Sequence, residues 1–272
     1  MERFSLTKIL ALLISLVVMS GGCKDKTPKY SSGYMRGPCY LDIDAGGKDS
    51  TLVIYTLHFN DVDLVCGKMP DYNVETDIIF CCEAAFTGEL LEEFSHGNIA
   101  GNHISGGVLY KGYDCPDNTG EFIAANGTVW GFVLTKSKPG SECDVERSFM
   151  LDENHLPSVN GFPVTMGFGQ NMIIYDFKTQ PRFRDRLPDG KYYFRSLCCL
   201  NGELCIVDSK EEIRYAEYVE LLEQLGVQYA LYLDMGSGWN HSWYRERPAG
   251  EVTVIHPWVE KCKYTTNWIV FR

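Results

Sequence analysis

The alternation of hydrophobic and polar positions along the chain predicts many short β-strands. Apolar runs of strand length recur, and Gly, Asn, Asp or Pro residues separate them. The expected strands lie at residues 52–57, 77–86, 106–112, 121–134, 172–177, 192–207 and 229–233. Two of these segments contain an Asn-Gly pair, at 126–127 and 201–202. An Asn-Gly pair between apolar runs is a strong signal for a tight β-hairpin.

One helix carries clear start and stop signals, and it is expected over residues 210–225. Ser209 and Glu212 fit a capping box at its start, and Gly226 fits the position just past its end. Apolar residues between them recur at helical spacing and predict one buried face: Tyr215, Tyr218, Val219, Leu222 and Leu225. A short second helix is predicted at 88–96. Many strands and few helices favour an α+β fold, a single domain on a mixed or mostly antiparallel sheet.

The N-terminus has the organisation of an export signal. Arg3 and Lys8 accompany an apolar core over residues 9–19, which is shorter than the roughly 20 residues of a membrane-spanning helix. Small residues then precede Cys23, as at the cleavage and lipidation site of a bacterial lipoprotein. Ser20 stands where such sites usually carry an aliphatic residue. We therefore expect acylation of Cys23, and an ordinary secreted protein is the alternative.

These features divide the chain into three segments: a signal peptide at 1–22, the lipidated cysteine and a tether at 23–38, and one folded domain at 39–272. The expected location is the bacterial cell envelope, with a membrane partner engaged through the acyl anchor. The net charge of −11 argues against non-specific binding to nucleic acid, so we expect no nucleic-acid partner.

The eleven cysteines permit disulfides in an exported protein, but their spacing does not reveal pairing. The neighbouring pairs at 81–82 and 198–199 lie in predicted strands, where successive side chains point to opposite faces. They are interpreted as buried thiols. No Cys-x-x-Cys motif occurs, and His58, His103 and His241 are scattered. The sequence therefore predicts no cofactor and no metal site, and it offers no ligand cluster for a divalent cation.

Two charged residues are the main candidates for chemistry. Asp234 directly follows the predicted strand 229–233 and precedes a glycine-rich turn. This arrangement suits an anionic or sugar-like ligand. Arg195 lies beside another predicted strand. If the two strands are neighbours, Arg195 would hold a phosphate bidentately while Asp234 faces the sugar. A structural Arg195–Asp234 ion pair without any substrate is the alternative, and the residues alone leave both open.

Several motifs follow one another in a characteristic order over roughly residues 78–245. They are Gly-Gly-Val-Leu-Tyr at 106–110, Glu-Phe-Ile-Ala-Ala-Asn-Gly at 121–127, Phe-Arg-Ser-Leu-Cys-Cys at 194–199, Asn-Gly-Glu-Leu at 201–204 and Leu-Asp-Met-Gly-Ser at 233–237, after the helix. In this order the chain resembles the phosphodiester glycosidase domain family, the bacterial relatives of the mannose-phosphate uncovering enzyme.

The resemblance implies hydrolysis of a sugar-1-phosphodiester at its glycosidic bond, with a carbohydrate or sugar-phosphate ligand. It implies that Asp234 is the essential carboxylate, that Arg195 holds the phosphate together with residues 236–238, and that Glu83 is a second carboxylate by its position. The substrate-binding residues expected from the aligned motifs are Gly107, Asn126, Gln170, Asn171, Gly236, Ser237, Gly238 and Asn240.

The sequence also departs from the family pattern. The family's Asn-Gly-Gly motif falls at 84–88 without its asparagine, its Gln-Ser-Gly-Pro motif is altered at 168–171, and Met235 replaces a glycine. The alternative function is therefore a catalytically degenerate glycan-binding or ligand-binding surface lipoprotein. Sugar stacking on Trp130, Trp239 or Trp243 would suit that alternative, although such rings also serve as core residues.

Overall fold

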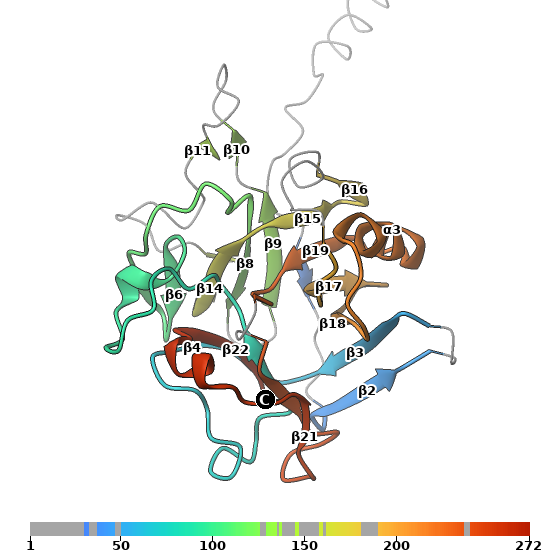
Figure 1. The fold of residues 1–272 in the computed structure, drawn as a ribbon, viewed down its shortest axis with the longest axis horizontal. Coiled ribbons are helices and arrows are strands. Elements are labelled where there is room, and N and C mark those ends of the chain that lie inside the picture. Colours follow the sequence, from blue (N-terminus) through green and yellow to red (C-terminus); the bar gives the residue numbers. More distant parts are fainter. Residues whose placement is uncertain are drawn as a thin grey trace, which may run out of the picture.

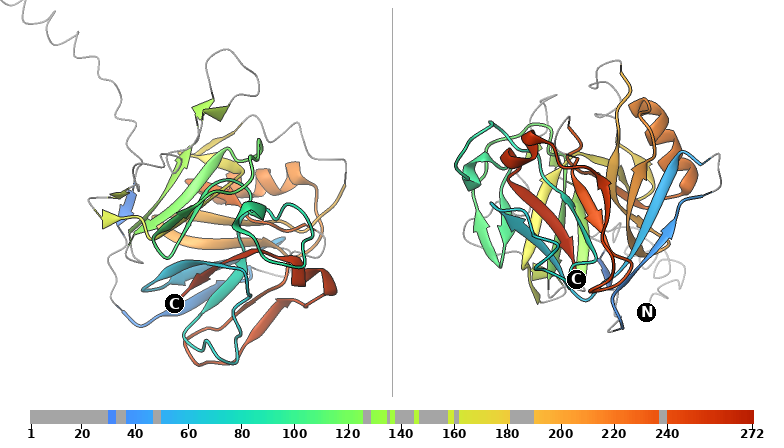
Figure 2. Two further views of the ribbon diagram at one scale, coloured as in Figure 1. Left: turned by 90° about the vertical axis from the view of Figure 1, so that its left-hand side faces the viewer. Right: turned by 60° about the horizontal axis from the view of Figure 1, so that its bottom comes forward.

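The computed structural model describes residues 30–32, 37–46, 50–125, 129–134, 136–137, 145–146, 158–159, 162–180, 190–236 and 240–272. Three large antiparallel sheets, two two-stranded sheets and one α-helix make up most of this part of the chain (Figures 1 and 2). The helix, α3 (Tyr215–Leu225), lies beside β17–β19, on the opposite side of the molecule from β6 (Figure 1). The predicted predominance of antiparallel strands is confirmed, and the described residues contain fewer helices than expected.

Each of the three sheets combines strands that are distant in the sequence. In spatial order, the six-stranded sheet comprises β1 (Tyr30–Ser32), β9 (Val129–Leu134), β8 (Gly120–Ala125), β14 (Met166–Gln170), β6 (His103–Ser105) and β7 (Val108–Tyr110). The seven-stranded sheet comprises β16 (Lys178–Thr179), β15 (Met172–Tyr175), β19 (Tyr229–Tyr232), β17 (Arg195–Leu200), β18 (Glu203–Ser209), β3 (Leu52–His58) and β2 (Tyr40–Asp44). The five-stranded sheet comprises β21 (Thr253–His256), β20 (Ser242–Tyr244), β5 (Phe80–Glu83), β22 (Asn267–Phe271) and β4 (Val62–Cys66).

The remaining elements are short. Strands β10 (Lys136–Ser137) and β11 (Val145–Glu146) pair with each other, as do β12 (Ser158–Val159) and β13 (Phe162–Pro163). Two 3₁₀ helices, η1 (His96–Asn98) and η3 (Glu260–Tyr264), lead into β6 and β22. Among the described residues, no helix combines the length and the apolar character needed to cross a membrane.

All three sheets contribute to one hydrophobic core. Phe168 of β14, Leu231 of β19 and Ile269 of β22 are fully buried in the same cluster. Helix α3 packs on the other face of the seven-stranded sheet, where Tyr218 and Leu222 belong to a second cluster. Because both faces of β17 and β19 are covered, residues 197–200 and 229–232 are continuously apolar rather than alternating.

The adjacent cysteine pairs follow the two-residue period of a strand. Cys199 lies in the core shared by the sheets and Cys198 in the cluster under α3, while Cys82 and Cys81 are divided in the same way between two clusters. All nine cysteines in the described part of the chain are free thiols. The interpretation of these two pairs as buried thiols is confirmed.

The hairpin predicted at residues 201–202 is confirmed. Asn201 and Gly202 have φ angles of 52° and 85°, and they join β17 to β18. Two successive positive φ values are typical of the primed turns of two-residue hairpins, and Asn and Gly tolerate them best. The pair at 126–127 lies outside the described residues, although the flanking strands β8 and β9 do pair antiparallel.

Two helix predictions need correction. Helix α3 begins six residues after Ser209, which ends β18 and whose Oγ accepts a hydrogen bond from the Phe194 N–H (2.9 Å) instead of capping a helix. The predicted end is correct, because Gly226 adopts a left-handed conformation with φ 78°. Residues 88–95 form no helix, and His96 begins the 3₁₀ helix η1. The Asn98 side chain bonds both backbone groups of Glu89 there (2.7 Å each) and holds an irregular loop.

Candidate active site

The predicted carboxylates Glu83 and Asp234 meet where the five-stranded and seven-stranded sheets come together. Glu83 is the last residue of β5, and Asp234 follows β19 by two positions. The backbone N–H of Asp234 donates to the Ala84 carbonyl oxygen (3.1 Å), which joins the two strand ends directly. The start of β22 lies alongside, because the Asn267 side chain bonds both backbone groups of Ala85 (2.8 and 3.0 Å).

Asp234 is almost entirely buried, with 5 % of its surface exposed. One carboxylate oxygen accepts from the Gly236 N–H (3.1 Å) and the other from the Thr87 N–H (3.4 Å). Burial nevertheless dominates and raises the pKa of Asp234 from 3.8 to about 7. At neutral pH this carboxyl group is therefore divided between its ionised and protonated forms.

Glu83 is buried still more completely, with 2 % exposed. Its Oε1 accepts from the Thr265 hydroxyl (2.6 Å), and its Oε2 has no hydrogen-bond partner among the described residues. Burial, followed by the neighbouring charge of Asp234, raises the pKa of Glu83 well above its usual range. The site thus contains two buried carboxyl groups with raised pKa values, and such shifts are frequent among the acids and bases of active sites.

A group of hydroxyls and amides surrounds the two carboxyl groups. The Oγ1 atoms of Thr87 and Thr266 lie 2.9 Å apart and tie the loop after β5 to β22. Gln170, at the end of β14, donates from Nε2 to the Ala84 carbonyl (3.4 Å) and accepts from the Asn171 N–H (2.9 Å). Gln170 therefore lies beside the strand end that carries Glu83, and Asn171 directly follows it.

Aromatic side chains lie at the partly exposed border of this site. The rings of Phe86 and Tyr232 are in contact, with centroids 5.9 Å apart. Burial, followed by the neighbouring charges of Cys115 and Asp234, raises the pKa of the Tyr113 hydroxyl. Sequence reasoning missed Thr87, Thr265, Thr266 and these rings, because nothing in their local sequence marks them as neighbours of Asp234.

The structure pairs Arg195 with a residue that neither interpretation named. Its side chain is fully buried, and it forms a bidentate ion pair with Asp208, with Nε–Oδ1 2.7 Å and Nη2–Oδ2 2.5 Å. The guanidinium therefore has a protein counter-ion in place of a phosphate, and that counter-ion is not Asp234. A signal for this pairing exists in the sequence: a two-residue turn at 201–202 places position 195 opposite position 208.

The other predicted residues fall in several places. Gly236 belongs to the site through its N–H on Asp234. Asn240 precedes β20, and its carbonyl accepts from the Ser242 hydroxyl (3.1 Å). Gly107 lies in the β6–β7 turn, and its N–H donates to the carbonyl oxygen of Thr165, which directly precedes β14. Gln170 lies at the opposite end of β14. The predicted role of Gly107 beside the carboxylates therefore lacks support.

Some predicted residues cannot be placed. Asn126, Ser237, Gly238, Cys23 and Trp239 lie outside the described residues. Trp130 and Trp243 are core residues, with 3 % and 0 % exposed. The suggested sugar stacking on these two rings is therefore wrong.

The fold has a solved structural neighbour. The chain is similar to the catalytic domain of zebrafish N-acetylglucosamine-1-phosphodiester alpha-N-acetylglucosaminidase, auto-inhibited by its pro-peptide. The TM-score is 0.52 at 12 % sequence identity, over 90 % of this chain and 87 % of that one. No protein-family model and no curated protein sequence matches the chain. At this identity the likeness shows a shared fold.

The Arg195–Asp208 pair generates a prediction about stability. Asp208→Leu should lower the free energy of unfolding by about 3–5 kcal/mol, because it leaves the guanidinium buried without a counter-charge. The double variant Arg195→Met/Asp208→Leu should recover most of this loss, since apolar side chains then replace the pair. Urea titration of the single, double and parent chains measures the three values.

The matched control is Asp42→Asn, which breaks the exposed contact of Asp42 with His58 (3.2 Å). It should change the free energy of unfolding by no more than about 1 kcal/mol. A double variant as unstable as Asp208→Leu would contradict the assignment of Arg195 to a structural ion pair.

Proposed function

We propose that this protein hydrolyses the glycosidic bond of a sugar-1-phosphodiester. The observation that carries the proposal is the pair of buried carboxyl groups, Glu83 and Asp234, with pKa values raised to different extents. The fold shared with the catalytic domain of a phosphodiester glycosidase supports it, as does the order of the sequence motifs that contain Asp234.

The chemistry of the substrate suits a site with few charged groups. In the proposed reaction, water attacks the anomeric carbon, the bond from that carbon to the phosphate oxygen breaks, and the leaving phosphate monoester takes the electron pair. Such a leaving group needs little help from a general acid. The barrier lies in the positive charge that develops on the sugar ring and in the placement of water.

The two carboxyl groups supply different functions in this scheme. Ionised Asp234 stabilises the positive charge and accepts the proton that water gives up. Protonated Glu83, through its unpartnered Oε2, donates a hydrogen bond to water or substrate. Because Arg195 is engaged by Asp208, we assign binding of the phosphate to the hydroxyls of Thr87 and Thr266.

Binding of a sugar ligand without turnover is the second candidate. Two observations favour it: the Arg195 guanidinium is paired with Asp208, and Asp234 already accepts hydrogen bonds from the N–H groups of Thr87 and Gly236. Both candidates use the same residues, so measurement of turnover against binding distinguishes them.

Activity should depend on pH through the two carboxyl groups. The value of kcat/KM is expected to rise as Asp234 loses its proton, with a midpoint near pH 7, and to fall at higher pH as Glu83 loses its own. Asp234→Asn should lower kcat/KM by about 10²–10⁴-fold, and Glu83→Gln should remove the descending limb. Release of reducing sugar from a panel of sugar-1-phosphodiesters, UDP-N-acetylglucosamine included, measures both effects.

The matched control is Glu203→Gln, which alters an exposed acid in the β17–β18 hairpin and should leave the rates unchanged. Turnover by a folded Asp234→Asn variant at the parent rate would remove Asp234 from the mechanism. Saturable sugar binding without turnover on any member of the panel would favour the second candidate.

We also propose that the protein is an exported lipoprotein of the bacterial cell envelope, anchored by acyl chains on Cys23. The arrangement of residues 1–23 supports this location. Expression in a bacterial host should place the parent chain in the membrane fraction and label it with radioactive palmitate, and Cys23→Ser should abolish both. Labelling that persists in Cys23→Ser would contradict the anchor.

A further inference from the structure

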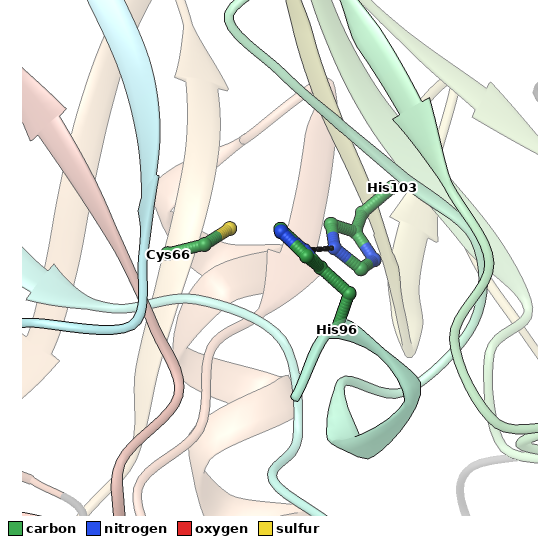
Figure 3. A group of neighbouring side chains, drawn as sticks. All are labelled: Cys66, His96 and His103. Atoms are coloured by element: carbon green, nitrogen blue, oxygen red, sulfur yellow. Dashed lines mark hydrogen bonds between the residues drawn. The ribbon is translucent and has the colours of Figure 1, made fainter. Parts of the chain in front are cut away.

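Three potential metal ligands converge at a place remote in sequence from Asp234. They are Cys66 at the end of β4, His96 at the start of η1 and His103 at the start of β6. One ligand atom of each lies within 4.8 Å of the others. Figure 3 shows the sulfur and both imidazole rings pointing toward one another. The group joins the five-stranded sheet to the six-stranded sheet.

Neighbouring groups already fix the orientation of both imidazoles. The Nδ1 of His103 lies 3.3 Å from the Gly101 carbonyl oxygen, and this contact turns its Nε2 toward His96. Tyr110 stacks on His96 with ring centroids 3.6 Å apart and planes within 4° of parallel. A histidine that ligates a metal usually gives its other ring N–H to a carbonyl or carboxylate, as His103 does here.

The spacing of the ligand atoms suits a small cation. His96 Nδ1 and His103 Nε2 lie 2.9 Å apart, so a single proton now joins the two nitrogens. In a tetrahedral zinc site with Zn–N bonds near 2.0–2.1 Å, ligand nitrogens are about 3.3 Å apart. To bind a metal ion in place of the shared proton, the two nitrogens would separate by a few tenths of an ångström, and the Cys66 sulfur, within 4.8 Å of them, would approach to about 3.6 Å.

We propose that Cys66, His96 and His103 bind one zinc ion. A thiolate and two imidazoles are ligands that zinc prefers. Binding releases the Cys66 thiol proton, and the proton shared by the histidines moves to His96 Nε2. With three protein ligands, the fourth position of a tetrahedral ion would be filled by water or a small ligand. The proposal does not depend on the function proposed above.

The zinc ion would also stabilise the loop that contacts Asp234. His96 begins η1, and Asn98 in the same turn bonds Glu89 through its side chain (2.7 Å). Ile99, directly after η1, forms a β-bridge with Thr87, whose N–H donates to Asp234. A metal that fixes η1 therefore restrains the segment that carries this donor.

Cobalt substitution in the full chain tests the proposal. After treatment with chelator, Co²⁺ should bind with one equivalent and give a thiolate-to-cobalt charge-transfer band together with the visible bands of a four-coordinate ion. Zn²⁺ should displace it. Cys66→Ser should abolish the charge-transfer band, and His103→Gln should weaken binding by more than about 100-fold, beyond the loss typical of a supporting residue.

Two control variants remove similar side chains elsewhere. Cys115→Ser alters another half-buried thiol, and His58→Gln alters a histidine in β3. Both should retain the parent spectrum and affinity. A charge-transfer band that survives Cys66→Ser, or no Co²⁺ binding by the parent chain, would overturn the proposal.

A measurement on the parent chain avoids any variant that fails to fold. X-ray absorption of the zinc-loaded protein should show one sulfur ligand and three nitrogen or oxygen ligands at the usual bond lengths. Zinc should also raise the Tm of the parent chain, because it binds the folded state. A zinc spectrum without a sulfur ligand would show that the three side chains are only a hydrogen-bonded and stacked group.

Discussion

The burial of two carboxyl groups at one junction of sheets is the constraint on which the candidate site depends. Withdrawing a charged carboxylate from water is costly, and placing a second one beside it adds repulsion. The chain meets this constraint by keeping Glu83 protonated and by giving Asp234 two backbone N–H donors that only partly offset its burial. Stability alone would favour apolar residues at both positions. Two such groups at a junction that also carries hydroxyls and amides are therefore the feature that most favours catalysis.

The fold explains how this junction is held. The three sheets share one core, and β5 and β19 end beside each other because the Asp234 N–H donates to the Ala84 carbonyl. Behind the site, Arg195 and Asp208 form a buried ion pair between β17 and β18. The strand β17, which carries Arg195, pairs directly with β19. The solved catalytic domain to which the chain is similar shares this fold.

Local signals in the sequence predicted much of the fold and only part of the site. The Asn201-Gly202 turn, the end of α3 at Gly226 and most strands follow from short-range chemistry. The helix start was predicted wrongly at Ser209, because a serine three residues before a glutamate fits a capping box. In the structure the Ser209 hydroxyl oxygen accepts a hydrogen bond from the Phe194 N–H instead. The surroundings of the carboxyl groups were not predictable, since Thr265 and Glu83 are 182 positions apart and Thr87 and Asp234 are 147 apart. The cluster of Cys66, His96 and His103 joins separate sheets and has no regular spacing.

The most direct test is a carboxyl NMR titration of the isotope-labelled full chain, with the two resonances assigned by Asp234→Asn and Glu83→Gln. We expect the Asp234 signal to titrate with a midpoint near pH 7 and the Glu83 signal to remain that of a protonated acid well above the usual range. Midpoints for both groups near pH 4, the ordinary value for exposed carboxyls, would contradict the account.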